Sequence, residues 1–175
     1  MKEKSRKRTS WLAGLIAVAT VIAVGVVAPA SQTVAQALRI GGSSAHFGAH
    51  VLNGGFLPDP ASYNIVSGGD MDARTLGLAP NCRGFVTAQP DVIVRYTNPS
   101  SFLRFYVRAA GDTTLVVNDP SGRWFCSDDE GGGLNPMIDF VRPQGGQYDI
   151  WIGSYGAGQN IRGQFFATEL SGNRP

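Results

Sequence analysis

Short stretches in which apolar and polar residues alternate are the feature that most limits what this chain can fold into. Successive side chains of a β-strand point to opposite faces, so a two-residue period indicates a strand with one buried face. The pattern recurs in six stretches, at residues 91–97, 102–108, 113–118, 137–141, 147–155 and 161–170. Turn-forming residues separate these stretches, which predicts strands that follow one another in antiparallel sheets.

Less regular stretches extend the series toward the N-terminus. We expect extended structure at 49–57, 62–66, 82–87 and 123–126, and a loop or one helical turn at 71–81. Eight to ten short strands without a long amphipathic helix predict an all-β fold, an antiparallel β-sandwich of the jelly-roll kind, with a barrel as the alternative. The apolar faces are expected to meet in the core, and the arginine-bearing faces are expected to stay in water.

The N-terminal segment has the features of an export signal. Five of its first ten residues are Lys or Arg, residues 11–30 are uncharged, and Ala35-Gln36-Ala37 has the form of a cleavage site. We therefore expect a Sec-type signal peptide at 1–37, with an N-terminal signal helix, and a periplasmic or secreted bacterial protein. An uncleaved membrane anchor at 11–30, facing the periplasm, is the alternative, because about 20 apolar residues can span a bilayer.

The remaining 138 residues suffice for one domain with a real core. We expect a flexible lead-in at 38–48, a β-domain at 49–170 and a tail at 171–175. Beyond residue 37 the chain has ten arginines and 12 acidic residues, a formal charge of about −2. This balance gives no reason to expect binding to nucleic acid or to an anionic membrane surface.

The two cysteines, Cys82 and Cys126, both follow the leader. An even number of cysteines in an oxidising compartment predicts a disulfide bond. Closing a loop of about 45 residues stabilises the fold by about 4 kcal/mol in the chain-entropy model. A reactive thiol would need a polarising neighbour, and no histidine lies near either cysteine in the sequence.

A group of acidic residues follows the strand expected at 113–118. Five carboxylates fall within 21 residues, together with the amide of Asn135 and glycines 131–133, and they are Asp119, Asp128, Asp129, Glu130 and Asp139. Carboxylates, amides and backbone carbonyls are the ligands that calcium prefers, although the spacing is not that of an EF-hand. The alternative is a polar surface hairpin with a turn at 119–122 and solvated acids.

Aromatic residues and histidines offer further candidate sites. Trp124, Trp151 and Tyr155 can form a platform for a sugar or peptide, or they can fill the core and pair across strands. His46 and His50 have the spacing of a helical metal pair, but the glycines around them disfavour a helix, and the alternative is two solvated loop histidines.

Four motifs lie between residues 49 and 170 and can be compared with known families. They are Asp119-Pro120-Ser121-Gly122, Cys126 with Asp128-Asp129, Asn135-Pro136 with Ile138 and Phe140, and the segment 146–155. Together these motifs resemble the bacterial pre-peptidase C-terminal domain family, including small secreted proteobacterial proteins that are sometimes labelled serine peptidases, and the similarity spans about residues 49–170. The resemblance implies a small noncatalytic β-sandwich that binds a protein or a polymeric ligand. Because some members bind calcium near acidic turns, it implies Asp119, Asp128, Asp129 and Asn135 as ligands.

A secreted serine-type peptidase or another hydrolase is the alternative function. A serine nucleophile needs a base and a group that orients the base, and only His46 and His50 could supply the base. Ser154, in Gly153-Ser154-Tyr155-Gly156, does not lie in a G-x-S-x-G elbow. We therefore expect a noncatalytic binding module with an unknown protein or polymer of the cell envelope as partner; a purely structural envelope protein is a third possibility.

Overall fold

A computed structural model describes residues 37–175, which form eleven strands and one short 3-10 helix, η1 (Ala73–Thr75). The described part of the chain is therefore almost entirely β, as predicted. The signal helix and the possible anchor at 11–30 lie outside the described residues. Within residues 37–175, no helix is long and apolar enough to cross a membrane.

The larger sheet has seven strands, in the order β1-β5-β10-β4-β3, with β7 paired to β10 and β8 paired to β7. Their bounds are β1 (Ala49–Asn53), β3 (Met71–Asp72), β4 (Phe85–Val86), β5 (Val92–Thr97), β7 (Thr113–Asn118), β8 (Trp124–Ser127) and β10 (Gly146–Ser154). All pairs are antiparallel except β1 with β5, which run parallel. The antiparallel expectation thus fails only at this edge.

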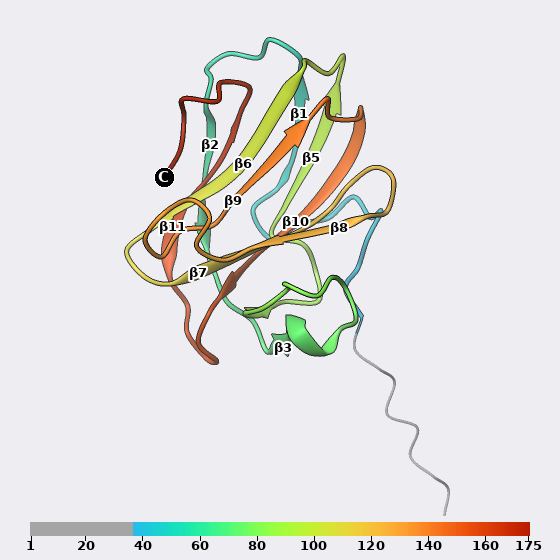
Figure 1. The fold of residues 1–175 in the computed structure, drawn as a ribbon. Coiled ribbons are helices and arrows are strands. Elements are labelled where there is room, and N and C mark those ends of the chain that lie inside the picture. Colours follow the sequence, from blue (N-terminus) through green and yellow to red (C-terminus); the bar gives the residue numbers. More distant parts are fainter. Residues whose placement is uncertain (1–36) are drawn as a thin grey trace, which may run out of the picture. The chain divides into compact units, whose positions relative to one another are not determined.

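The smaller sheet has four antiparallel strands in the order β2-β11-β6-β9. They are β2 (Ala61–Val66), β6 (Phe102–Ala109), β9 (Met137–Val141) and β11 (Arg162–Thr168). In Figure 1 these strands run alongside those of the larger sheet, and β3 with η1 lies at the lower end.

The main core contains the alternating apolar side chains of both sheets. The larger sheet contributes Leu52, Val92, Val94, Tyr96, Leu115, Val117, Tyr148, Ile150 and Ile152, and the smaller sheet contributes Ala61, Ile65, Leu103, Phe105, Val107, Ile138, Phe140, Phe165 and Ala167. These are the faces that the two-residue period predicted. The apolar surface of both sheets is therefore removed from water by one shared core.

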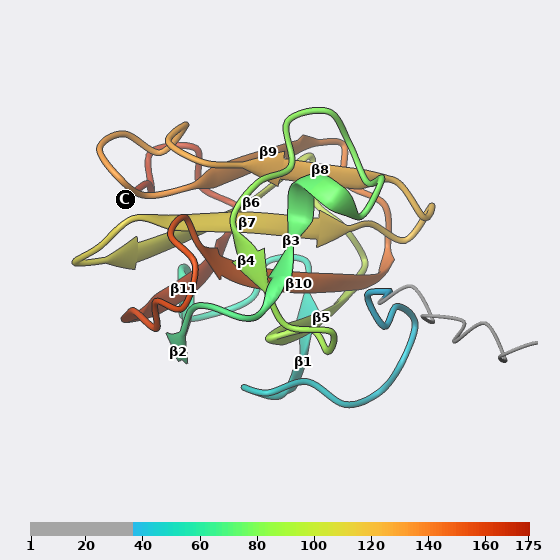
Figure 2. The ribbon, with the colours of Figure 1, turned by 90° about the horizontal axis from the view of Figure 1, so that it is seen from below.

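The opposite faces are not fully in water, which corrects the expectation for them. On the larger sheet, Val116 and Trp151 are completely buried beneath the segment containing β3, η1 and β4, in a second apolar cluster. Figure 2, seen from below, shows β3 and β4 in front of β7 and β10. On the smaller sheet Arg104 is only 7% exposed, because it pairs with Asp139 and donates to carbonyls of the segment 171–175.

The predicted disulfide between Cys82 and Cys126 is present, with 5.0 Å between the two Cα atoms. It joins the loop before β4 to β8, and both cysteines lie in the second apolar cluster. The Asn81 side-chain amide also donates to the Cys126 carbonyl at 2.7 Å. The covering segment is thereby fixed directly beside the acidic loop that begins at Ser127.

Candidate metal centre at the acidic loop

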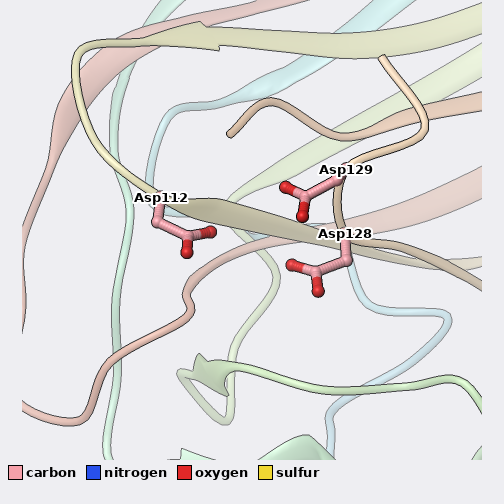
Figure 3. A group of neighbouring side chains, drawn as sticks. All are labelled: Asp112, Asp128 and Asp129. Carbon is pink, nitrogen blue, oxygen red and sulfur yellow. The ribbon is translucent and has the colours of Figure 1, made fainter. Parts of the chain in front are cut away.

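Strands β7 and β8 form a hairpin that decides which acidic residues meet. Leu115 pairs with Ser127 and Asn118 pairs with Trp124, so the connecting turn lies at 119–122. The residues just before β7 and just after β8 consequently lie together at the other end. This pairing brings Asp112 next to Asp128 and Asp129, and Figure 3 shows the three side chains reaching toward one another from two loops.

Asp112, Asp128 and Asp129 are called the acidic triad below. Each offers one carboxylate oxygen, and the three oxygens lie within 4.8 Å of one another. The Oδ1 atoms of Asp112 and Asp128 are buried, and neither has a hydrogen-bond partner among the described residues. Buried polar atoms normally have a hydrogen-bond partner. A donor or a cation placed near these two oxygens would therefore stabilise them.

The electrostatics of the acidic triad reflect its burial and the closeness of its carboxylates. Burial raises the pKa of Asp112, and the nearby Asp129 carboxylate raises it further. The pKa of Asp128 is raised first by burial and then by Asp129 and Asp112. Both shifts disfavour the ionised form, which is the form a metal ion would stabilise.

Neighbouring groups hold the loop without satisfying the acidic triad. One Glu130 carboxylate oxygen accepts from the Ser127 hydroxyl and from the Asp128 amide, the latter at 2.7 Å. The Ser127 hydroxyl oxygen accepts from the Met137 amide at 2.8 Å. Arg83 lies 3.8 Å from the other oxygen of Asp128, at the outer limit of an ion pair. The hydrogen bonds within the loop thus fix its shape, but they leave the buried Oδ1 atom of Asp128 without a partner.

Asp119 does not belong to this group, contrary to the ligand set that the resemblance implied. It lies in the turn at the opposite end of the hairpin, about 23 Å along the strand from Asp112 at about 3.3 Å per strand residue. Its Oδ1 accepts from the amides of Ser121 and Arg123, and its Oδ2 pairs with the Arg123 guanidinium at 2.8 Å. Burial alone would raise the pKa of Asp119, but these hydrogen bonds lower it.

Asn135 is also absent from the group. Its Oδ1 accepts a hydrogen bond from the Ala109 amide at 2.9 Å, and its carbonyl accepts one from Gly131 at 3.0 Å. These contacts fasten the acidic loop to the end of β6. Asn135 therefore has a structural role in this geometry, with its amide oxygen already occupied.

Asp112 was missed in the sequence because it stands apart from the acidic run. One signal could have found it. If Asp119-Pro120-Ser121-Gly122 is accepted as the turn of a hairpin, counting outward in antiparallel register places residue 112 opposite the acids at 128–130. The expectation treated sequence proximity as spatial proximity, and the hairpin reverses that order.

The three candidate aromatic residues do not form one exposed platform. Trp151 is completely buried, and half-buried Trp124 packs against it with 5.5 Å between ring centroids. Only Tyr155 is open, with 49% of its surface exposed. The core alternative therefore describes both tryptophans, and Tyr155 remains available to a ligand.

The residues considered for catalysis are also separated. Ser154 is fully buried, and its hydroxyl bonds to the Ser67 hydroxyl at 2.7 Å and to the Gln159 carbonyl at 2.9 Å. His50 stacks on Tyr63 with 3.8 Å between ring centroids, and its Nε2 lies 3.0 Å from the Phe47 carbonyl oxygen. Ser154 thus has no hydrogen bond to either histidine.

Comparison with known proteins gives little functional information. No family model matches the chain. An uncharacterized protein from the cyanobacterium Synechococcus elongatus is 41% identical over 81 residues, which is 44% of this chain and 58% of that protein. The chain thus spans less than two thirds of the length of the curated relative it matches.

Proposed function

We propose that the chain is a noncatalytic, extracytoplasmic binding module of β-sandwich architecture whose acidic end is stabilised by calcium. The observation that carries the proposal is the acidic triad with its two buried, unpartnered oxygens. Three carboxylates at this separation repel one another, and a divalent cation converts that repulsion into attraction. Asp112, Asp128 and Asp129 would hold the ion.

Calcium suits the triad better than the other common divalent ions. All three donors are carboxylates, which favours a hard cation over zinc or copper. Calcium accepts six to eight oxygens in irregular geometry, and backbone carbonyls and water can complete its shell, whereas magnesium requires a near-ideal octahedron. A site made by two loops from different strand ends fits the more tolerant ion.

The absence of catalysis in this proposal is supported by the arrangement of potential nucleophiles and bases. Ser154 is held in a buried network with Ser67, and the two histidines of the chain lie between Ala45 and Val51, where His50 is stacked on Tyr63. Acyl transfer by serine requires a hydroxyl within reach of its base and open to substrate. A noncatalytic role is also what the resemblance to the pre-peptidase C-terminal family implies.

Thermal unfolding with calcium and with chelator tests the metal. A ligand that binds only the folded state stabilises it by about 2.7 kcal/mol when present at 100 times its Kd. We expect the melting temperature to rise with calcium and to rise much less with equimolar magnesium. Asp112→Asn should abolish the calcium shift, whereas Asp70→Asn, which removes an exposed acid elsewhere, should retain it.

Two results would refute the calcium site. One is an unchanged melting temperature in millimolar calcium. The other is an equal calcium response in Asp112→Asn and in the unsubstituted protein, which would place any bound calcium elsewhere. Casein hydrolysis by the purified protein, lost in Ser154→Ala or His50→Ala, would overturn the noncatalytic assignment.

A further inference from the structure

A second cavity adjoins the acidic triad and shares a wall with it. It has a volume of about 370 Å³ and is lined by Arg74, Arg83, Gly84, Tyr155 and Gly156. Arg83 also lines the neighbouring depression that contains Asp128 and Asp129. The backbone connects the two sites as well, since the Tyr155 amide donates to the Asp112 carbonyl at 3.1 Å. We call the cavity lined by Arg74, Arg83 and Tyr155 the arginine pocket.

The arginine pocket presents free hydrogen-bond donors beside an exposed aromatic ring. Arg74 uses Nε and Nη2 on Asp72, and its Nη1 has no partner among the described residues. The Arg83 side chain is 47% exposed, and its contact to Asp128 is long, at 3.8 Å. Tyr155 is 49% exposed. Guanidinium groups favour carboxylates, and an exposed tyrosine ring offers an apolar face with a polar edge.

Gly84 lines the arginine pocket and also lies close to Thr114 of β7. Gly84 has a φ of 87°, in the left-handed region, and a Cβ there would lie 2.2 Å from the Thr114 hydroxyl oxygen. Any side chain at position 84 is therefore excluded by both strain and space. Gly84 is therefore required by the close approach of this loop to β7.

The charge around the arginine pocket depends on the acidic triad. Without a cation, Asp72 and the three acidic-triad carboxylates outnumber the two arginines, so an anionic ligand is repelled. A calcium ion on the triad adds two positive charges and neutralises Asp128, which is the partner of Arg83. Arg83 is then free to turn its donors to a ligand in the pocket.

We propose that the arginine pocket binds a carboxylate-bearing sugar of the uronic-acid type, and that calcium on the acidic triad switches this binding on. The carboxylate lies between Arg74 and Arg83, and the sugar ring packs on Tyr155. This inference rests on the proposed calcium site and adds a ligand class to it. By thermodynamic linkage, the sugar must tighten calcium binding by the same factor that calcium tightens sugar binding.

The test is a titration of the ¹⁵N-labelled protein with D-glucuronate, followed by NMR, in calcium and in chelator. We expect glucuronate to shift the resonances of Tyr155, Gly84 and the Arg83 side chain, and to bind at least about tenfold more tightly in calcium. D-Glucose, the neutral twin, should cause no such shifts. Sulfate, an anion without a sugar ring, should bind more weakly than glucuronate.

Three variants separate the parts of the proposal. Arg83→Gln should lose glucuronate binding and keep the calcium-induced rise in melting temperature. Tyr155→Ala should weaken glucuronate binding and leave sulfate binding unchanged. Arg162→Gln is the matched control, because it removes an exposed arginine on β11 that lines neither cavity, and it should bind glucuronate normally.

The outcomes distinguish this inference from the calcium site itself. Calcium stabilisation without any glucuronate binding overturns the inference and leaves the calcium site standing. Equal glucuronate affinity in calcium and in chelator overturns the switch. Equal binding of glucose and glucuronate, or an equal loss of binding in Arg83→Gln and Arg162→Gln, overturns the role of the arginine pocket.

Discussion

The two ends of the β7–β8 hairpin carry the same kind of side chain in opposite states. At the turn, Asp119 is 4% exposed and receives hydrogen bonds from Ser121 and Arg123. At the other end, Asp112 and Asp128 each bury an oxygen that has no partner in the described part of the chain. Aspartates near one hairpin can therefore be structural or available for a ligand, and the number of donors facing them decides which.

Another aspartate, Asp91, lies between these extremes, and the largest effect is expected from it. Asp91 is 2% exposed, and its Oδ2 accepts from the Ile152 amide at 2.7 Å. Burial raises its pKa to about 8, although the Ile152 hydrogen bond opposes the shift. Between about pH 4 and about pH 8 the folded state therefore holds a proton that the unfolded state has lost.

The stability should accordingly fall as the pH rises through this window, by up to about 1.4 kcal/mol per pH unit from this one group. Asp91→Asn should flatten the profile and stabilise the protein at pH 7. Urea unfolding at pH 5, 6, 7 and 8, in chelator, measures both. An identical slope in the variant would show that Asp91 is ionised in the native protein and that its single donor suffices.

Removing the disulfide tests whether the acidic end needs an external anchor. Replacing Cys82 and Cys126 together by serine should cost about 4 kcal/mol of unfolding free energy, through the entropy of the unfolded chain. The loss of local order should be uneven: amide exchange should accelerate at Ser127 and Asp128, while the turn around Asp119 keeps its protection. Uniform acceleration would mean that the two ends unfold together.

Asp119→Ala tests the turn end of the hairpin, where the aspartate has its hydrogen-bond donors. It leaves the Ser121 and Arg123 amides without their acceptor, and a loss of about 2 to 3 kcal/mol is expected. Urea denaturation gives the value, and the calcium shift in melting temperature should be unchanged. A loss of the calcium shift would return Asp119 to the ligand set that the resemblance implied.

Asp128→Asn should change the free energy of unfolding least. In chelator it should raise this free energy, whereas removal of the disulfide and Asp119→Ala lower it. In chelator it removes one charge from a repelling cluster, so we expect a gain of up to about 1 kcal/mol. In calcium the same variant should be less stable than the unsubstituted protein, because the ion has lost a ligand. A destabilised variant in chelator would indicate that Asp128 is already paired, through Arg83, as fully as Asp119 is through Arg123.

The strand pattern could be predicted closely from the sequence because alternation is local. The stretch expected at 113–118 is β7, with Leu115 and Val117 in the core, and the stretch expected at 137–141 is β9. The parallel pairing of β1 with β5 could not be predicted, because it joins residues more than 40 positions apart and leaves no periodic trace. The buried state of Trp151 was equally hidden, since its cover comes from the segment around β4.

The candidate site was predicted in part, for a reason of the same kind. Asp128 and Asp129 were chosen by residue type, which is sufficient to group two acids that are adjacent in the sequence. The prediction grouped Asp119 with them, although the hairpin separates these residues, and it left out Asp112, because the spatial grouping of carboxylates follows strand register and hydrogen-bond satisfaction. Neither property can be read from composition. The position of the turn Asp119-Pro120-Ser121-Gly122, however, fixes which residues of the two strands pair.

The bond between Cys82 and Cys126 also determines which protein preparations can answer these questions. Material made in a reducing cytosol would carry free thiols at Cys82 and Cys126, the latter two residues ahead of Asp128. The loop that bears Arg83 would then no longer be covalently tied to β8. If such material failed to bind a ligand, the cause could be the missing disulfide bond, and the result would not test the proposed sites. Oxidative folding, verified by the loss of alkylatable thiols, therefore comes before any ligand measurement.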